Sequence, residues 1–151
     1  MWARLRRFSA LPAVAKSDFA LATLLLPLIR VSLWLRGFRA TQKSLQSRML
    51  SEAAVPCAAA AGTDARRVCR MVRAAGRHSL IQSTCLERSL ALWWLLARRG
   101  IRSQLRIGAR KSGGKFEAHA WVERNGEAIG GPEETHVHYA AFEREFSGDL
   151  W

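Results

Sequence analysis

Residues 83–100 read Ser-Thr-Cys-Leu-Glu-Arg-Ser-Leu-Ala-Leu-Trp-Trp-Leu-Leu-Ala-Arg-Arg-Gly, a stretch that predicts a helix with a start signal, an apolar body and a stop signal. Thr84 is the expected N-cap and Glu87 its capping-box partner, because this spacing satisfies two free backbone N–H groups at a helix start. Gly100 is the expected left-handed terminator. Cys85 is therefore predicted to be the first helical residue.

Cys85 would stand where a helix favours negative charge. The unpaired N–H groups and the positive end of the helix dipole favour a thiolate, the nucleophilic form of cysteine, and Arg88 one turn later would add to this effect. The alternative is that Cys85 is a small apolar residue packed at a helix end. On this residue alone both interpretations stay open.

Three strands are expected after the helix. Apolar and polar residues alternate beyond Gly100, as in a half-buried strand. Asn125-Gly126 is the strongest short hairpin signal, so it should join the second strand to a third. A helix followed by antiparallel strands predicts the α+β class. The strands are expected at residues 104–110, 116–124 and 127–129.

His119 lies in the second expected strand, where neighbouring residues point to opposite faces. Phe116, Ala118, Ala120 and Val122 share one face, which is expected to belong to the core. His119 is then on the other face. It could meet a nucleophile only if the preceding helix or a covering segment lay there, or if the strand were buried on both faces.

Taken together, these motifs resemble a known family. The segments are Cys-Leu-Glu-Arg-Ser-Leu-Ala-Leu at 85–92, Arg-Gly-Ile at 99–101 and Ala-His-Ala-Trp-Val-Glu at 118–123. The stretch from Cys85 to about Phe142 is similar to the transglutaminase-like cysteine protease of lasso-peptide biosynthesis, a stand-alone leader peptidase. The resemblance implies a papain-like core in which N-terminal helices and a nucleophile helix pack on a small antiparallel sheet.

The resemblance also implies a mechanism. Cys85 would attack the scissile carbonyl of a precursor peptide, and His119 would take up the thiol proton and return it to the leaving amine. Departure of that amine would leave the peptide core with a free N-terminus for macrolactam closure, and water would then hydrolyse the thioester and release the leader. The Cys85 N–H is the expected first oxyanion donor and Gln82 the second. Thiol chemistry of this kind requires no cofactor.

The partners implied are three other polypeptides. They are the precursor peptide, a leader-recognition protein (the RiPP recognition element) and an ATP-dependent lasso cyclase. The recognition element is expected as a separate chain because 151 residues leave no room for it beside the protease.

The third catalytic residue departs from the family pattern. Relatives carry an aspartate on the strand after the histidine, at the position that is Gly131 here. A one-residue bulge would place Glu133 opposite His119, so Glu133 is the predicted orienting acid and Glu134 the alternative. If neither acid reaches the imidazole, a backbone carbonyl could hold it, the pair could act as a slow dyad, or the chain could be an inactive relative.

His136 and His138 raise the question of a metal site. Their spacing would place both on one face of a strand, near Glu133 and Glu134. No cysteine pair or His-Glu-x-x-His motif accompanies them. We therefore predict no metal centre.

Two parts are expected along the chain. A helical region at 1–50 and a protease core at 51–151 are joined by alanine-rich residues 53–62, which include a proline and a glycine. The first part is expected to pack on the second, because about 50 residues of helix would struggle to fold alone.

An apolar run at 19–35 dominates the first part. Pro27 and Arg30 interrupt it, so we do not predict a membrane-spanning helix. Lys16 and Asp18 disfavour a secretory signal. We predict a helical hairpin buried against the core, with docking of a partner protein or peripheral membrane contact as the functional alternatives.

Three cysteines without framework spacing indicate a reducing compartment, so a cytoplasmic location is predicted. Cys69 repeats at helical spacing with Ala65, Val68 and Val72 and is assigned to the core. Cys57 has no helix start or base nearby. Neither competes with Cys85 as the nucleophile.

The formal net charge is +12, from 24 Lys and Arg against 12 Asp and Glu. This would suit a nucleic-acid-binding protein. However, no helix-turn-helix, zinc finger or RNA-recognition motif can be identified, and the aromatic residues lie mostly in apolar runs rather than between basic residues. We favour docking of an acidic leader peptide or acidic partner. Acyl transfer to an amine and a non-catalytic, precursor-binding role stay open as alternatives to hydrolysis.

Overall fold

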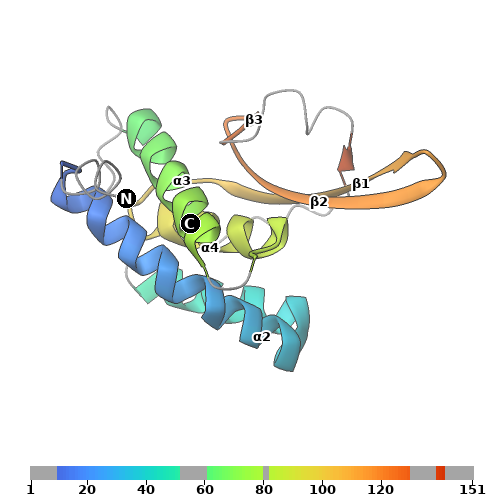
Figure 1. The fold of residues 1–151 in the computed structure, drawn as a ribbon, viewed down its shortest axis with the longest axis horizontal. Helices are drawn as coiled ribbons and strands as arrows, with labels where there is room; N and C mark the ends of the chain where they lie inside the picture. Colours follow the sequence, from blue (N-terminus) through green and yellow to red (C-terminus); the bar gives the residue numbers. More distant parts are fainter. Residues whose placement is uncertain (1–9, 52–60, 80–81, 130–138, 142–151) are drawn as a thin grey trace.

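The structure is a computed structural model that describes residues 10–51, 61–79, 82–129 and 139–141. It confirms the predicted α+β class, with helices packed beside a small antiparallel sheet (Figure 1). The elements in chain order are α2 (Ala13–Ser51), α3 (Ala61–His78), α4 (Cys85–Ala97), β1 (Gln104–Ser112), β2 (Lys115–Arg124), β3 (Glu127–Ala128) and β4 (Ala140–Ala141).

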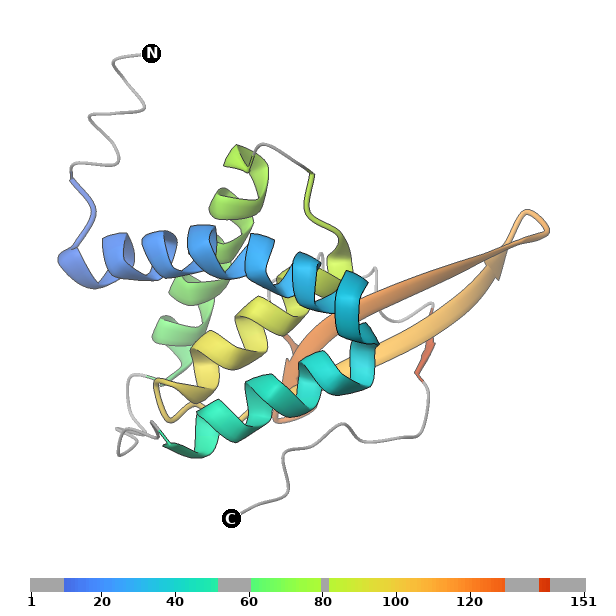
Figure 2. The same ribbon diagram turned by 90° about the horizontal axis from the view of Figure 1, so that it is seen from below.

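Helix α2 bends sharply at Gly37. The backbone there has φ 74° and ψ 178°, outside the helical region and in a region that glycine reaches without strain. Pro27 lies inside the helix before the bend. Figure 2 shows the two limbs of α2 meeting at an angle and lying along the other helices, and α2 contacts both α3 and α4.

The inner side of α2 is buried, and its outer face is apolar and exposed. We define the outer face by residues that are between 45% and 83% exposed, namely Val14, Leu24, Leu28, Val31, Trp34 and Leu35. Residues 13–49 are long and apolar enough to cross a membrane by length and composition. Buried core helices and signal sequences share this length and composition, so the two properties alone do not assign α2 to a membrane.

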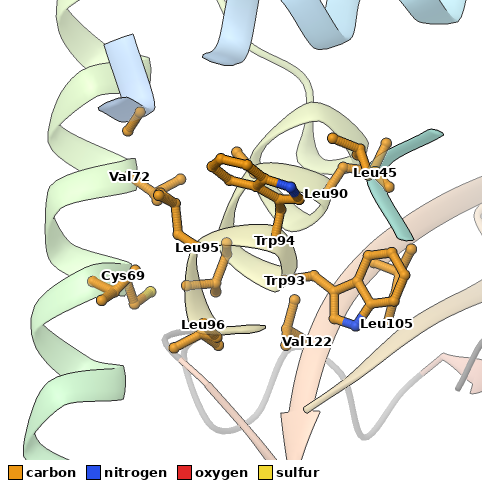
Figure 3. Close-up of a cluster of buried hydrophobic side chains, with 14 of the residues drawn as sticks. Leu45, Cys69, Val72, Leu90, Trp93, Trp94, Leu95, Leu96, Leu105 and Val122 are labelled. Carbon is orange, nitrogen blue, oxygen red and sulfur yellow. The ribbon is translucent and has the colours of Figure 1, made fainter. Parts of the chain in front are cut away.

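Helix α4 lies at the centre of the molecule. All of its residues from Ser89 to Leu96 are buried, as expected for a helix that is apolar on every side. Figure 3 shows its side chains between those of α3 and those of the sheet, including Val72, Leu105 and Val122. Burial of this helix by α2, α3 and the sheet forms one hydrophobic cluster.

A buried charge links the three helices. Asp18 of α2 is completely buried, and its carboxylate accepts a hydrogen bond from Arg99 Nε at 3.1 Å. Arg67 of α3 lies 3.5 Å from the other carboxylate oxygen. Because Arg99 lies two residues beyond the end of α4, this cluster ties the end of α4 to both other helices.

The sheet has the strand order β3-β2-β1-β4. The turn between β2 and β3 is the predicted Asn125-Gly126 pair, with φ 52° and 80°, as a type I′ hairpin requires. The third strand is shorter than predicted, but Ile129 N still donates to Val122 O at 2.8 Å. Strand β4 was not predicted, since two residues carry no alternation pattern.

Two of the expected core residues are exposed. Phe116 is 80% exposed, because the far end of the β1–β2 hairpin extends beyond the helices (Figure 2). Ala118 is exposed as well, whereas Ala120 and Val122 are buried as predicted. Only the second half of β2 therefore contributes side chains to the core.

Candidate functional site

Helix α4 begins as the sequence predicts. Thr84 is extended, with φ −74° and ψ 165°, and its Oγ1 accepts a hydrogen bond from Glu87 N at 3.2 Å. The Glu87 carboxylate accepts one from Thr84 N at 2.9 Å, which completes the capping box. Cys85 is the first residue of the helix and is half-buried. Its place at the helix start is thus confirmed.

Arg30 of α2 forms hydrogen bonds with the first turn of α4 and with the loop before it. Its Nε donates to Glu87 Oε1 at 2.8 Å, and its Nη2 donates to Glu87 Oε2 at 3.1 Å and to Gln82 O at 2.6 Å. The hydrogen bonds to Glu87 raise the pKa of Arg30. Sequence reasoning treated Arg30 only as an interruption of an apolar run. The signal was there, because a lone charge on a packed helix needs a partner.

Two arginine side chains donate hydrogen bonds to successive backbone carbonyl groups of the loop before Cys85. Arg88 Nη1 donates to Ser83 O at 2.9 Å, next to the Gln82 carbonyl that Arg30 holds. Arg88 was expected to act on the thiol, but the structure shows its guanidinium bonded to this loop. The Gln82 residue is exposed, and its use as an oxyanion donor stays a prediction.

Gly76 of α3 lets the loop approach closely. A Cβ atom at this position would lie 2.5 Å from Ser83 Oγ and 3.2 Å from Arg88 Cδ. A larger residue at this position would force the side chains of Ser83 and Arg88 to move from their observed positions. The position of the nucleophile thus depends on α2 and α3 as well as on its own cap.

Helix α4 is tied to the strand that carries His119. Ser89 Oγ donates to Ala120 O at 2.8 Å, and this bond is buried. Ser89 lies one turn after Cys85, where side chains four apart are about 5–6 Å from each other. Ala120 follows His119 directly. The two predicted catalytic residues therefore lie on neighbouring segments, although no hydrogen bond between their side chains is seen.

His119 occupies an aromatic face of the sheet. Its ring stacks on Trp121 at 6.2 Å between centroids and lies 5.3 Å from the ring of Tyr139, while Gly108 is its partner on β1. Val122 points the other way, into the core. Ala120, Trp121 and Val122 are 4%, 7% and 1% exposed, so β2 is covered on both faces here. His119 shares its face with Trp121, opposite the face on which Val122 enters the core, so its approach to Cys85 stays a prediction.

Tyr139 is a site neighbour that sequence reasoning missed. It approaches His119 from the segment that leads into β4, far along the chain from β2. The guanidinium of Arg110 lies 4.8 Å from the centre of its ring. No local sequence pattern predicts this contact, because it depends on where a later segment of the chain returns to the sheet.

Several predicted residues lie outside the described residues. These are the predicted orienting acid Glu133, its alternative Glu134, the family position Gly131, and the histidines His136 and His138. The identity of the residue that orients His119 therefore stays a prediction.

The cysteines differ in environment. Cys69 is 5% exposed, and burial raises the pKa of its thiol, with Arg73 opposing this in part. Its assignment to the core is confirmed. Cys85 is the more accessible of the two thiols that the structure describes, and Cys57 lies outside that part.

A family model described as the transglutaminase-like superfamily matches residues 25–144. This range contains Cys85 and His119 and most of α2. No curated protein matches the chain, and no solved structure does.

Proposed function

Because the chain belongs to the transglutaminase-like superfamily, which generally comprises cysteine peptidases and acyltransferases, we propose that it is a thiol peptidase with Cys85 as nucleophile. We propose further that it removes the leader from a ribosomally made lasso-peptide precursor. The first part rests on the family and the site. The second rests on the resemblance of residues 85–142 to leader peptidases.

The start of α4 is the observation that carries the proposal. A capping box and Arg30 fix the first turn of the helix, and the buried Ser89–Ala120 hydrogen bond holds it against the strand of His119. A nucleophile needs such positioning, because misplacement by about 1 Å can cost about a hundredfold in rate.

In the reaction we propose, Cys85 supplies the nucleophile and His119 carries the proton between the thiol and the leaving amine. His119 takes the proton of the Cys85 thiol as the sulfur attacks the scissile carbonyl carbon. The C–N bond then breaks, and His119 returns the proton to the leaving amine. Water hydrolyses the thioester and restores the thiol. The free backbone N–H groups at the start of α4, with that of Cys85 first, would bind the oxyanion.

The partners proposed are the precursor peptide, a leader-recognition protein and an ATP-dependent lasso cyclase, all in the cytoplasm. The outer face of α2 supports a protein partner, since exposed apolar patches of this kind commonly mark interaction sites. Peripheral membrane contact through the same face is the competing proposal. Binding of α2 variants to vesicles and to the recognition protein would separate the two.

The test mixes the purified protein and its recognition partner with the precursor peptide encoded nearby, and follows peptide masses over time. We expect leader and core fragments with the wild type and none with Cys85→Ala. Addition of a primary amine such as cadaverine at millimolar concentration separates the acyltransferase alternative, which would give an amide adduct in place of a free acid. Tight peptide binding without cleavage by the wild type would contradict the proposal and favour a binding subunit.

A further inference from the structure

A basic cleft lies between α3 and the β2–β3 turn, in a part of the molecule that holds neither Cys85 nor His119. Its volume is about 1220 Å³. Four arginines line it, namely Arg66, Arg70 and Arg73 from α3 and Arg124 from the end of β2. The α3 residues recur at intervals of four and three, so they lie along one side of the helix.

These four guanidinium groups have no partner among the described residues. Five described arginines outside the cleft are matched with acids: Arg30 with Glu87, Arg67 with Asp18 and Asp64, Arg99 with Asp18, Arg106 with Glu123, and Arg110 with Glu117. The contrast is sharpest on α3, where Arg67 has two acids and its neighbour Arg66 has none. Glu127 is the one acidic residue that lines the cleft.

Unpaired like charges around one cavity indicate an anionic ligand. Each guanidinium raises the potential felt by the others, and an anion between them removes that repulsion and gains charge-assisted hydrogen bonds. Arginine also presents a planar fork of donors that matches a carboxylate. The cleft is therefore suited to a ligand with several carboxylates spread along it.

The walls of the cleft favour a peptide over a nucleic acid. None of its lining residues is aromatic, so bases would find no stacking surface. Its second wall includes β3 and Ile129, and β3 is one of the two edge strands of the described sheet. An outer strand leaves backbone N–H and C=O groups that an extended peptide can pair with. Ala65, Cys69 and Ala128 add small apolar surface between the charges.

We propose that this cleft binds an acidic peptide segment in an extended conformation. Its carboxylates contact Arg66, Arg70, Arg73 and Arg124, and its backbone lies along β3. The site is separate from the nucleophile, so the proposal holds whether or not the bound chain is also the one that is cleaved. In this proposal, the positive charge of the protein acts at the cleft, where it binds the acidic peptide.

The test measures binding of a fluorescein-labelled decapeptide of alternating glutamate and valine by anisotropy at low salt. We expect Arg66→Gln/Arg70→Gln/Arg124→Gln to weaken binding at least tenfold. The matched control is Arg36→Gln/Arg39→Gln/Lys43→Gln, which removes the same charge from exposed positions of α2. It should change affinity less than twofold. Circular dichroism confirms that both variants are folded.

Four further results would overturn the proposal. Equal loss in both triple variants would show that only net charge attracts the peptide. Equal affinity for a decapeptide with glutamine in place of glutamate would remove the role of carboxylates. A ten-nucleotide single-stranded RNA that binds more tightly than the peptide, and loses that affinity in the cleft variant, would assign the cleft to nucleic acid. Complete displacement of the peptide by millimolar inorganic phosphate would reduce the cleft to a small-anion site.

Discussion

At the residue scale, the two described thiols stand in opposite surroundings. Cys85 is half-buried at the start of α4, while Cys69 is enclosed by the core and its pKa is raised by burial. The thiolate is the reactive form of cysteine, so burial makes Cys69 inert. The sequence pattern predicted these two surroundings correctly, because each depends on neighbours within one helix.

Alkylation should follow this difference. With iodoacetamide at pH 7.5 and the folded protein, we expect Cys85 to be modified and Cys69 to stay unmodified until the chain is unfolded in urea. Peptide mapping by mass spectrometry assigns each site. Faster modification of Cys69 than of Cys85 would contradict the account.

Cys69 should also make stability depend on pH. Its folded pKa lies above the unfolded value, so its contribution to stability is fully present below the ordinary thiol pKa of about 8.5 and is lost as pH rises through the folded pKa. We expect the urea midpoint to fall more steeply between pH 7.5 and 10 in the wild type than in Cys69→Ala. Parallel pH profiles would show that this thiol does not contribute.

At the scale of elements, the start of α4 is fixed by groups from three helices. The capping box is local and was predicted from four consecutive residues. Arg30 and Gly76 act on the same turn from α2 and α3, and they could not be assigned from the sequence, since their partners are distant in the chain. The bend at Gly37 and strand β4 were missed for the same reason. Hairpin turns are local, and Asn125-Gly126 was predicted correctly.

Arg30 should therefore act as a positioning residue for Cys85. We expect Arg30→Gln to lower the rate of peptide cleavage about 10- to 100-fold by loosening the first turn of α4. Arg36→Gln is the matched control, because Arg36 is exposed on the same helix and should leave the rate unchanged. Alkylation of Cys85 by iodoacetamide, measured in parallel, reports the position of the thiol independently of substrate. An unchanged rate in Arg30→Gln would remove this role.

Thr84→Ala tests the cap itself. Loss of the hydrogen bond to Glu87 N should lower the free energy of unfolding by about 1 kcal/mol, measured by urea denaturation. Thr84→Ser keeps the acceptor oxygen and should restore most of the stability. Equal stability of the two variants would mean that the hydroxyl does not cap the helix.

At the scale of the whole molecule, helix α2 has one side buried against the core and one side exposed to solvent. Leu26 is 2% exposed and belongs to the core, while Leu28, two residues later, is 64% exposed on the outer face. The sequence predicted that this region packs on the core. It did not show which face packs, because apolar residues lie on both sides of the helix.

A pair of alanine substitutions tests this division. Leu26→Ala should lower the free energy of unfolding by about 2–5 kcal/mol, as for other buried leucines. Leu28→Ala should change it by less than about 0.5 kcal/mol. Urea denaturation measures both, and a large loss for Leu28→Ala would show that the outer face is covered by other parts of the chain.

The most direct test of the central claim is the mass of the protein during turnover. The reaction with precursor peptide is stopped in acid after one half-turnover, and intact and digested protein are weighed. We predict an acyl adduct on Cys85 in the wild type that is absent from Cys85→Ala, while Cys69 and Cys57 stay unmodified. An adduct on another residue, or continued cleavage by Cys85→Ala, would contradict the account.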